Sequence, residues 1–201
     1  MYAIVKDGAI TATGTIKQLF PNTSFAGGVA NSEFKTSEGV KDIVHGEQKD
    51  QRYYFVTQGD IALVDGVPTQ QYTNTAKRLA DEDAKDSDGN QLYVQVYDPD
   101  FDNGEGNEKG KMVDTSTKQI NQGVKTPCLG EIKETANKLL SKTDWMIIRK
   151  VERSVDLPSA TETYRAAVIS ETSRLETAIA SAADVDALAT VMAGQNWPQE
   201  D

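Results

Sequence analysis

Few side chains in this chain of 201 residues could carry out chemistry. It has one cysteine, Cys128, and one histidine, His45. A single cysteine excludes an internal disulfide and every zinc site built from several cysteines, and a single histidine excludes a pair of histidine ligands. The motifs of zinc-dependent proteases and of dithiol redox proteins therefore lack their residues, and no catalytic residue is expected.

The two singular residues are more readily explained by structure than by chemistry. Cys128 falls in the first turn of an expected helix, where the helix dipole favours a thiolate, but no base lies near it in sequence. We interpret it as an ordinary small side chain at a helix start. His45 is expected at the exposed or half-buried end of a strand, and a ligand role would need acidic partners from elsewhere in the chain.

Carboxylates are the abundant candidates. The chain has 31 Asp and Glu against 21 Lys and Arg, for a formal net charge of −10. Residues 81–110 hold ten acids and two lysines, so this region alone contributes −8. The ten acids are Asp81, Glu82, Asp83, Asp86, Asp88, Asp98, Asp100, Asp102, Glu105 and Glu108. Because no basic face could neutralise phosphates, neither nucleic acid nor an anionic membrane is expected as a partner.

Three of these acids, Asp98, Asp100 and Asp102, match the first carboxylates of an EF-hand calcium loop in their alternate spacing. The rest of the motif fails, because the sharp-turn glycine comes one place late at Gly104 and Lys109 stands where a bidentate Glu is required. We therefore expect a solvated acidic loop and no cofactor. A weak calcium site remains the metal alternative.

The first 124 residues read as β-structure. Runs rich in alternating or β-branched residues predict strands at 2–6, 9–13, 52–57, 61–64, 67–72 and 91–97. Expected reversals lie between them at Asp7-Gly8, Gln58-Gly59-Asp60 and Asp65-Gly66. In the last strand the alternation puts Leu92, Val94 and Val96 on one face. The two aromatic residues of 19–25, Phe20 and Phe25, are expected to hold a loop onto the sheet.

After about Gly123 the apolar period becomes helical. Thr126 and Pro127 predict a helix start, and a second helix should begin at Thr143 or Asp144. Pro158 can open a third, and Ser181 with Asp184 resembles a capping box before a fourth. The expected apolar faces are Leu129, Ile132, Ala136 and Leu139; then Trp145, Ile148 and Val151; then Tyr164, Val168, Thr172, Leu175, Ile179 and Ala182; then Val185, Leu188 and Met192. Glu171 and Arg174 are placed elsewhere on the third helix.

Strand and helix signals are thus segregated and do not alternate, which predicts an α+β fold. We expect an N-terminal, mostly antiparallel β-sheet followed by a C-terminal helical hairpin or small helical bundle. The expected domains are a β-rich domain at 1–124, with acidic loops at 81–110, and a helical domain at 125–201. No run of residues is long and apolar enough for a membrane helix and no signal peptide is apparent, so a soluble protein is expected.

Two groups of short motifs resemble one protein family. Residues 139–145 (Leu-Leu-Ser-Lys-Thr-Asp-Trp), then Ile148-Arg149, Pro158 and Tyr164-Arg165, resemble the C-terminal pattern of tail-fibre assembly and related small tail proteins of tailed bacteriophages. Gly14-Thr15, residues 19–25 (Leu-Phe-Pro-Asn-Thr-Ser-Phe) and Gly39-Val40 resemble the opening of phage proteins with that ending. In physical terms the Thr-Asp-Trp segment is a helix junction, in which Thr143 caps, Asp144 complements the helix dipole and Trp145 buries against the previous helix. The chain departs from the pattern in its long helix after Tyr164, the helix restarted at Ser181 and its acidic middle region.

The resemblance implies a non-enzymatic tail-associated protein, either a tail-fibre assembly factor or a small tail or baseplate structural subunit, acting through protein–protein contacts. It implies phage tail-fibre or baseplate partners, with a homo-oligomer as a further option, and a location in the host cell cytoplasm during assembly or in the virion tail. The alternatives are a metal-dependent hydrolase and a calcium-binding adhesion module, both using the 81–110 region.

We expect the helical half to carry more aromatic and aliphatic surface than its helices can bury among themselves, which predicts where a partner binds. We expect the helix that starts at Pro158, with the segment after Ser181, to contact a tail component or a second copy. The residues predicted to make this contact are Leu175, Ile179, Leu188 and Met192.

Overall fold

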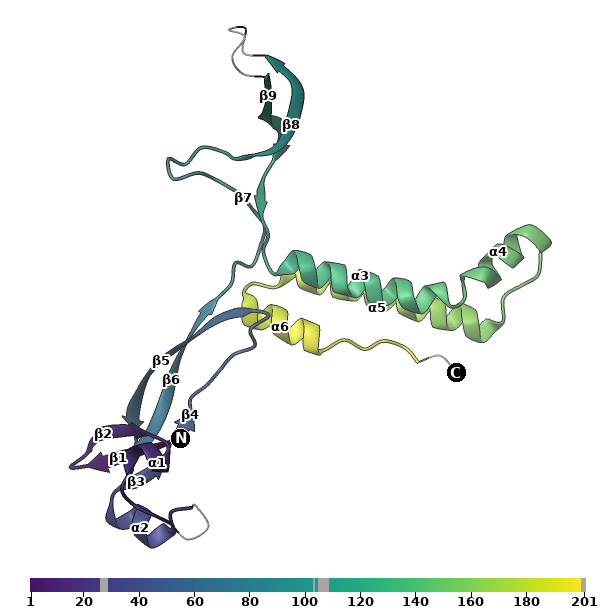
Figure 1. Cartoon of the computed structure of the whole chain (residues 1–201). Helices are drawn as coiled ribbons and strands as arrows, with labels where there is room; N and C mark the ends of the chain where they lie inside the picture. Colours follow the sequence, from purple (N-terminus) through teal and green to yellow (C-terminus); the bar gives the residue numbers. More distant parts are fainter. Residues whose placement is uncertain (26–28, 103, 105–108, 200–201) are drawn as a thin grey trace. The chain divides into compact units, whose positions relative to one another are not determined.

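The computed structural model describes residues 1–25, 29–102, 104 and 109–199 (Figure 1). Strands fill the N-terminal part and helices the C-terminal part, so the fold is α+β, as the sequence predicts. The chain divides into two compact units, Met1–Ala76 and Lys77–Asp201. The change from strands to helices falls close to residue 124, whereas the division between the units lies at 76/77.

The first unit contains two three-stranded sheets, ordered β2-β1-β3 and β4-β6-β5. Its elements are β1 (Tyr2–Lys6), β2 (Ala9–Gly14), α1 (Ile16–Leu19), α2 (Ser32–Ser37), β3 (Val40–Asp42), β4 (Val44–His45), β5 (Tyr54–Val64) and β6 (Val67–Ala76). Strand pairs are antiparallel except for β4 with β6, which is parallel. The expected mostly antiparallel structure is therefore present, although it is divided into separate sheets.

Two of the three expected reversals are turns. Asp7 and Gly8 have φ values of 52° and 75°, and Asp65 and Gly66 have 51° and 76°. Positive φ at both central residues is what a type I′ hairpin turn requires, and glycine adopts it without steric cost. Each dipeptide joins two adjacent antiparallel strands, β1 to β2 and β5 to β6.

The third expected reversal, at Gln58-Gly59-Asp60, is wrong. Residues 54–64 form one continuous strand, and the extra residues are absorbed as a β-bulge between Gln58 and Ile61. Gln70 of the facing strand is buried, and its side-chain amide donates to the carbonyl oxygen of Gly59. β6 pairs with β5 on both sides of the bulge, so the chain stays extended at the position where the turn is expected.

The segment 19–25 packs on a helix and not on a sheet. The rings of Phe20 and Phe25 each lie 4.9 Å from the ring of Phe34 on α2, in edge-to-face geometry. Edge-to-face pairs are a favourable arrangement of aromatic rings. Phe20 and Phe25 therefore do hold this loop, but they hold it against α2 and not against the expected sheet.

The second unit begins with two two-stranded sheets, β10-β7 and β8-β9, and continues into helices (Figure 1). Its elements are β7 (Glu82–Asp83), β8 (Tyr93–Asp102), β9 (Lys109–Lys118), β10 (Ile120–Asn121), α3 (Lys125–Ser141), α4 (Asp144–Arg153), α5 (Ser159–Ser181) and α6 (Val185–Ala193). Leu92, Val94 and Val96, expected on one face of a strand, are 36%, 39% and 48% exposed. Among the described residues β8 pairs with β9 alone, and these side chains stay partly exposed.

The start of α3 is set by contacts from an earlier segment. The helix begins at Lys125, before the expected cap Thr126, and its N-cap Val124 has no side-chain cap. Asp81 instead accepts hydrogen bonds from the Gly123 amide and the Thr126 hydroxyl, each at 2.8 Å. Pro127 still lies in the first turn, where a missing N–H leaves no helical bond unmade.

Helices α3 and α5 lie side by side (Figure 1), and α6 packs on α5. Their fully or nearly buried side chains include Ile132, Ala136, Val168, Leu175, Ile179, Val185, Leu188 and Met192. The expected cap of the last helix was also shifted, because Ser181 ends α5 while Asp184 caps α6 by accepting from the Ala187 amide at 2.8 Å. In the part of the chain that the structure describes, no helix combines the length and apolarity that a bilayer crossing needs.

Candidate partner-binding surface

The junction between α3 and α4 is a compact polar cluster. Arg165 of α5 donates through Nη1 to the Leu140 carbonyl at 2.8 Å and to the Thr143 hydroxyl at 2.7 Å. The same nitrogen lies 2.9 Å from the Asp144 carboxylate, and the Arg165 side chain is only 17% exposed. One guanidinium thus ties the end of α3 to the start of α4, and this fixes the direction in which α4 leaves.

That direction turns the apolar stripe of α4 outward. Trp145, Ile148 and Val151 follow each other at three-residue spacing, which places them on one side of the helix. They are 52%, 56% and 79% exposed. The sequence predicted the helix start and the stripe, but the burial of Trp145 against the preceding helix is wrong. The predicted capping by Thr143 is also wrong, because its hydroxyl donates to Leu140 and makes no cap bond.

One arginine of α4, Arg149, lies against this stripe. The Arg149 guanidinium carbon lies 5.0 Å from the centroid of the Trp145 ring, and its Nε is buried without a hydrogen-bond partner. Within the described residues, neither Arg149 nor Arg153 forms an ion pair. By contrast, Lys150 lies 3.1 Å from Glu162, whose hydrogen bond and charge raise the pKa of that lysine. The exposed stripe therefore has unpaired positive charge beside it.

The four residues predicted to bind a partner need correction. Leu175, Ile179 and Leu188 have no exposed surface, and Met192 is 5% exposed. They pack in the interior formed by α5 and α6, so a partner could reach them only if these helices separated. The helices therefore bury more of the apolar surface of the helical half among themselves than the sequence predicts. The exposed stripe of the helical half lies instead on α4.

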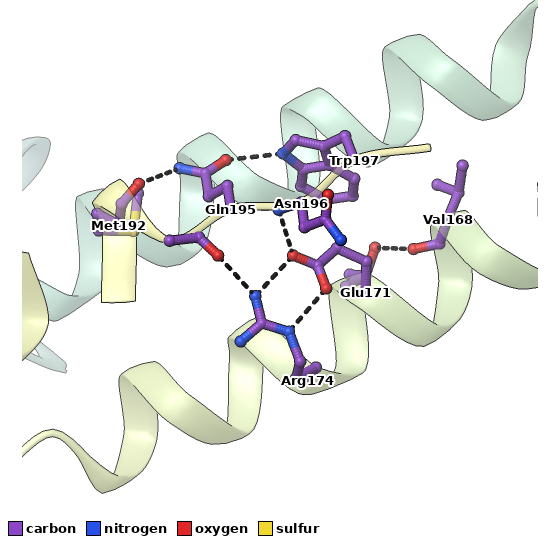
Figure 2. Close-up of polar contacts among 9 residues, drawn as sticks. Val168, Glu171, Arg174, Met192, Gln195, Asn196 and Trp197 are labelled. Carbon is purple, nitrogen blue, oxygen red and sulfur yellow. Dashed lines mark hydrogen bonds and ion pairs between the residues drawn. The ribbon is translucent and has the colours of Figure 1, made fainter. Parts of the chain in front are cut away.

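After α6 the chain returns along α5 and is held by a charged pair (Figure 2). Glu171 accepts two hydrogen bonds from Arg174 and one from the Asn196 amide, all at 2.7 Å. Arg174 also donates to the Gly194 carbonyl at 3.0 Å. Trp197 then packs against the buried cluster of Ala136, Tyr164 and Val168. We call residues 194–199 the C-terminal strap.

The chemistry of this pair follows from burial. The Glu171 side chain is 9% exposed, against 52% for Arg174. Hydrogen bonds from Arg174 hold the pKa of the Glu171 carboxyl below its ordinary value, in spite of the opposing effect of burial. The same contact raises the pKa of Arg174. Both groups therefore stay charged at neutral pH, and their role is to anchor the C-terminal strap.

The C-terminal strap borders two hollows. One has a volume of about 540 Å³ and the other about 450 Å³, and both are lined in part by Tyr164, Pro198 and Gln199. The larger hollow is lined mainly by hydroxyl and small side chains, among them Thr143, Ser159, Thr161 and Thr163. Apart from Tyr164, the described residues that line it have no titratable side chain.

The remaining candidate residues belong to different elements of the chain. His45 ends β4 as predicted, and its Nδ1 lies 2.7 Å from the Tyr72 hydroxyl. Cys128 is buried in the first turn of α3. In the calcium candidate, Asp98 accepts from the Asp100 amide at 3.0 Å and Asp102 from the Gly104 amide at 2.9 Å.

The acidic region does not bring its carboxylates together in the parts that are described. Across residues 1–25, 29–102, 104 and 109–199, no group of three or more His, Cys, Asp or Glu side chains is arranged to hold a metal ion. Two of the ten acids, Glu105 and Glu108, lie outside the described residues.

Comparison with known proteins found no match for this chain. No protein-family model matches it, and neither the curated proteins nor the solved structures include one that is significantly similar. Its function must therefore be inferred from its own residues and contacts.

Proposed function

We propose that this chain is a non-enzymatic, bacteriophage tail-associated protein, either a tail-fibre assembly factor or a small tail or baseplate structural subunit. It acts through protein–protein contacts, in the host cytoplasm during assembly or as part of the virion tail. Its short motifs resemble those of tail-fibre assembly proteins. The phage context rests on this resemblance, and the contact role rests on the exposed side chains of α4.

The observation that supports a contact function is the exposed face of α4. Isolated apolar side chains are common on protein surfaces, but three on consecutive turns of one helix, led by a tryptophan, form a stripe. Tryptophan and arginine are also enriched among residues that dominate binding energies. Trp145 and Arg149 stand in contact on this face, so α4 has the composition of a docking helix.

Ile148→Asp tests this assignment, with Ile169→Asp as its matched control. Ile148 is 56% exposed on α4, and Ile169 is 54% exposed on α5, so the two changes remove the same side chain from similar environments. The protein is co-expressed with the products of the genes that neighbour its own, and co-purification of a tail component is measured. Burying an aspartate in an apolar contact should weaken binding at least about tenfold.

The proposal expects Ile148→Asp to lose the tail component and Ile169→Asp to keep it. Mass spectrometry of purified particles then separates a subunit, which is present in the virion, from an assembly factor, which is absent. If the unmodified chain co-purifies with no tail component, or if both variants bind as well as it does, the proposed function is wrong.

A further inference from the structure

The larger hollow beside the C-terminal strap lies at the first turn of α5. Its lining includes Ser159, Ala160 and Thr161, the first three residues of that helix. The N-cap Pro158 makes no side-chain cap bond. Within the described part of the chain, the first amide of α5 that has a hydrogen bond is that of Glu162, which donates to the Pro158 carbonyl at 3.1 Å. The three amides before it are therefore free to donate to a ligand.

Tyr164 brings a second, independent donor to the same hollow. The residue is 9% exposed, and its hydroxyl is buried with no hydrogen-bond partner among the described residues. Side chains of a helix lean toward its N-terminus, which directs the Tyr164 ring back along α5 toward the first turn. Leaving a buried hydroxyl unpaired is costly and uncommon in folded proteins. An acceptor atom in the hollow would satisfy it.

The charge around the hollow favours an anion. The free amides stand at the positive end of the α5 dipole, where negative groups are stabilised. None of the described lining residues is an acid. The acids close to the lining in sequence already have partners, since Asp144 lies 2.9 Å from Arg165 and Glu162 lies 3.1 Å from Lys150.

The walls of the hollow suit a ligand that is partly apolar. Met146, Ala160, Ala167 and Pro198 contribute apolar surface to the lining. The volume of about 540 Å³ is in the range of small-molecule sites, which combine apolar walls with a few convergent polar groups. No described lining residue is a lysine or arginine, so a carboxylate with one charge fits this hollow better than a phosphate, which carries nearly two.

We propose that this hollow binds a small organic carboxylate with an apolar body. The carboxylate accepts hydrogen bonds from the first-turn amides of α5 and from the Tyr164 hydroxyl. The apolar body lies against Met146, Ala167 and Pro198. This binding site is separate from the contact role proposed for α4 and does not depend on it.

Titration of the full-length protein with hexanoate tests the site. Binding is followed by the amide resonances of Ser159, Ala160 and Thr161 at about pH 7, where a carboxyl group is ionised. These resonances should shift and saturate with a dissociation constant of about 1–10 mM, which is reasonable for so small a ligand. Hexanamide, which has the same tail without the charge, and inorganic phosphate should each bind at least about tenfold more weakly.

Tyr164→Phe removes only the hydroxyl and should raise the dissociation constant of hexanoate about tenfold. The urea midpoint of the free protein should not fall, because the hydroxyl has no partner in the described structure. Tyr97→Phe is the matched control, since Tyr97 is 63% exposed on β8 and does not line the hollow. This control should change neither the dissociation constant nor the urea midpoint.

Ala167→Leu fills the hollow and should also raise the dissociation constant at least about tenfold. Its matched control is Ala166→Leu. The two alanines are neighbours on α5 and both are exposed, but only Ala167 lines the hollow. Ala166→Leu should therefore bind hexanoate like the unmodified chain.

The carboxylate site is refuted if hexanoate causes no saturable shift up to about 50 mM, far above the expected dissociation constant. It is also refuted if hexanamide or phosphate binds as tightly as hexanoate, or if Tyr164→Phe or Ala167→Leu binds like the unmodified chain. A fall in the urea midpoint of Tyr164→Phe, or an equal loss of binding in either control, would contradict it too. Co-purification of a tail component tests the proposed function separately, so the two can fail independently.

Discussion

The charged anchor of the C-terminal strap can be weakened by a single isosteric change. In Glu171→Gln the side chain keeps its size but loses its charge and one acceptor oxygen. Of the three hydrogen bonds that Glu171 accepts, at least one from Arg174 is lost. A hydrogen bond to a charged group contributes about 1.5–3 kcal/mol net. Arg174 is half exposed, so water replaces part of that contribution and we expect a cost of about 1–2 kcal/mol.

The loss should appear as local opening of the C-terminal strap. The Asn196 amide donates to Glu171, so its hydrogen exchange reports directly on the anchor. A cost of 1–2 kcal/mol corresponds to exchange roughly 5- to 30-fold faster. A second probe is the fluorescence of Trp197, which is half-buried on the α3–α5 cluster. Replacing Trp145 by Phe in both backgrounds isolates its signal.

The matched control is Glu176→Gln on the same helix. Glu176 lies 3.5 Å from Lys133, and both side chains are largely exposed. Exposed ion pairs contribute little, so Asn196 exchange should change by less than about twofold. Unchanged Asn196 exchange in Glu171→Gln, or an equal acceleration in both variants, would refute the anchoring role of Glu171.

Three further outcomes are expected. The folded-state pKa of Glu171 is lowered, so its charge stabilises the fold fully above the unfolded pKa of about 4.3, and this stabilisation is lost as the pH falls toward the folded pKa. Between about pH 6 and pH 3, the urea midpoint of Glu171→Gln should therefore fall less steeply than that of the unmodified protein. Gly123→Ala should destabilise the protein by at least about 1–3 kcal/mol in urea unfolding, since an added Cβ would lie 2.4 Å from the Ala80 carbonyl carbon. Leu188→Ala should cost about 2–5 kcal/mol in the same assay and Ile148→Ala less than about 0.5, because only the first is buried.

Local signals in the sequence predicted local structure well. Asp7-Gly8 and Asp65-Gly66 were identified as turns because their conformational preference resides in the dipeptide itself. The turn predicted at Gly59 is wrong. Its sequence context resembles a turn, but pairing with the facing strand β6 determines its conformation. A bulge is a property of a strand pair, and the spacing within one strand does not reveal it.

Apolar periodicity identified the helical faces but not what covers them. The spacing predicts that Trp145 and Ile148 lie on one face of α4. The contacts that set the direction of α4 come from Arg165, about twenty positions away from Leu140 and Thr143 in sequence, and spacing within α4 does not reveal them. Leu175 and Ile179 likewise lie on an apolar face, and α5 packs that face into the interior. Which of two apolar stripes is buried depends on how the helices are joined in space.

Glu171, which anchors the C-terminal strap, was not predicted from the sequence. A signal was present, because 171 continues the series 164, 168, 175 and 179, which is the apolar face of α5. An acid within such a series, with an arginine three residues later, indicates a buried carboxylate with its own partner. The third hydrogen bond to Glu171 comes from the backbone amide of Asn196, which lies beyond the next helix, so spacing could not predict it.

Because Cys128 is buried, its reaction with a thiol reagent can report local opening of the native protein. Cys128 is the single thiol of the sequence and is 7% exposed in the first turn of α3. An alkylating reagent can reach its sulfur only when that turn detaches, so the rate of mass increase under native conditions measures how often this happens. Each chain gains one label at most, which makes the reaction quantitative without any engineered cysteine. Substitutions at Asp81, which holds the start of α3, could then be ranked by labelling rate alone.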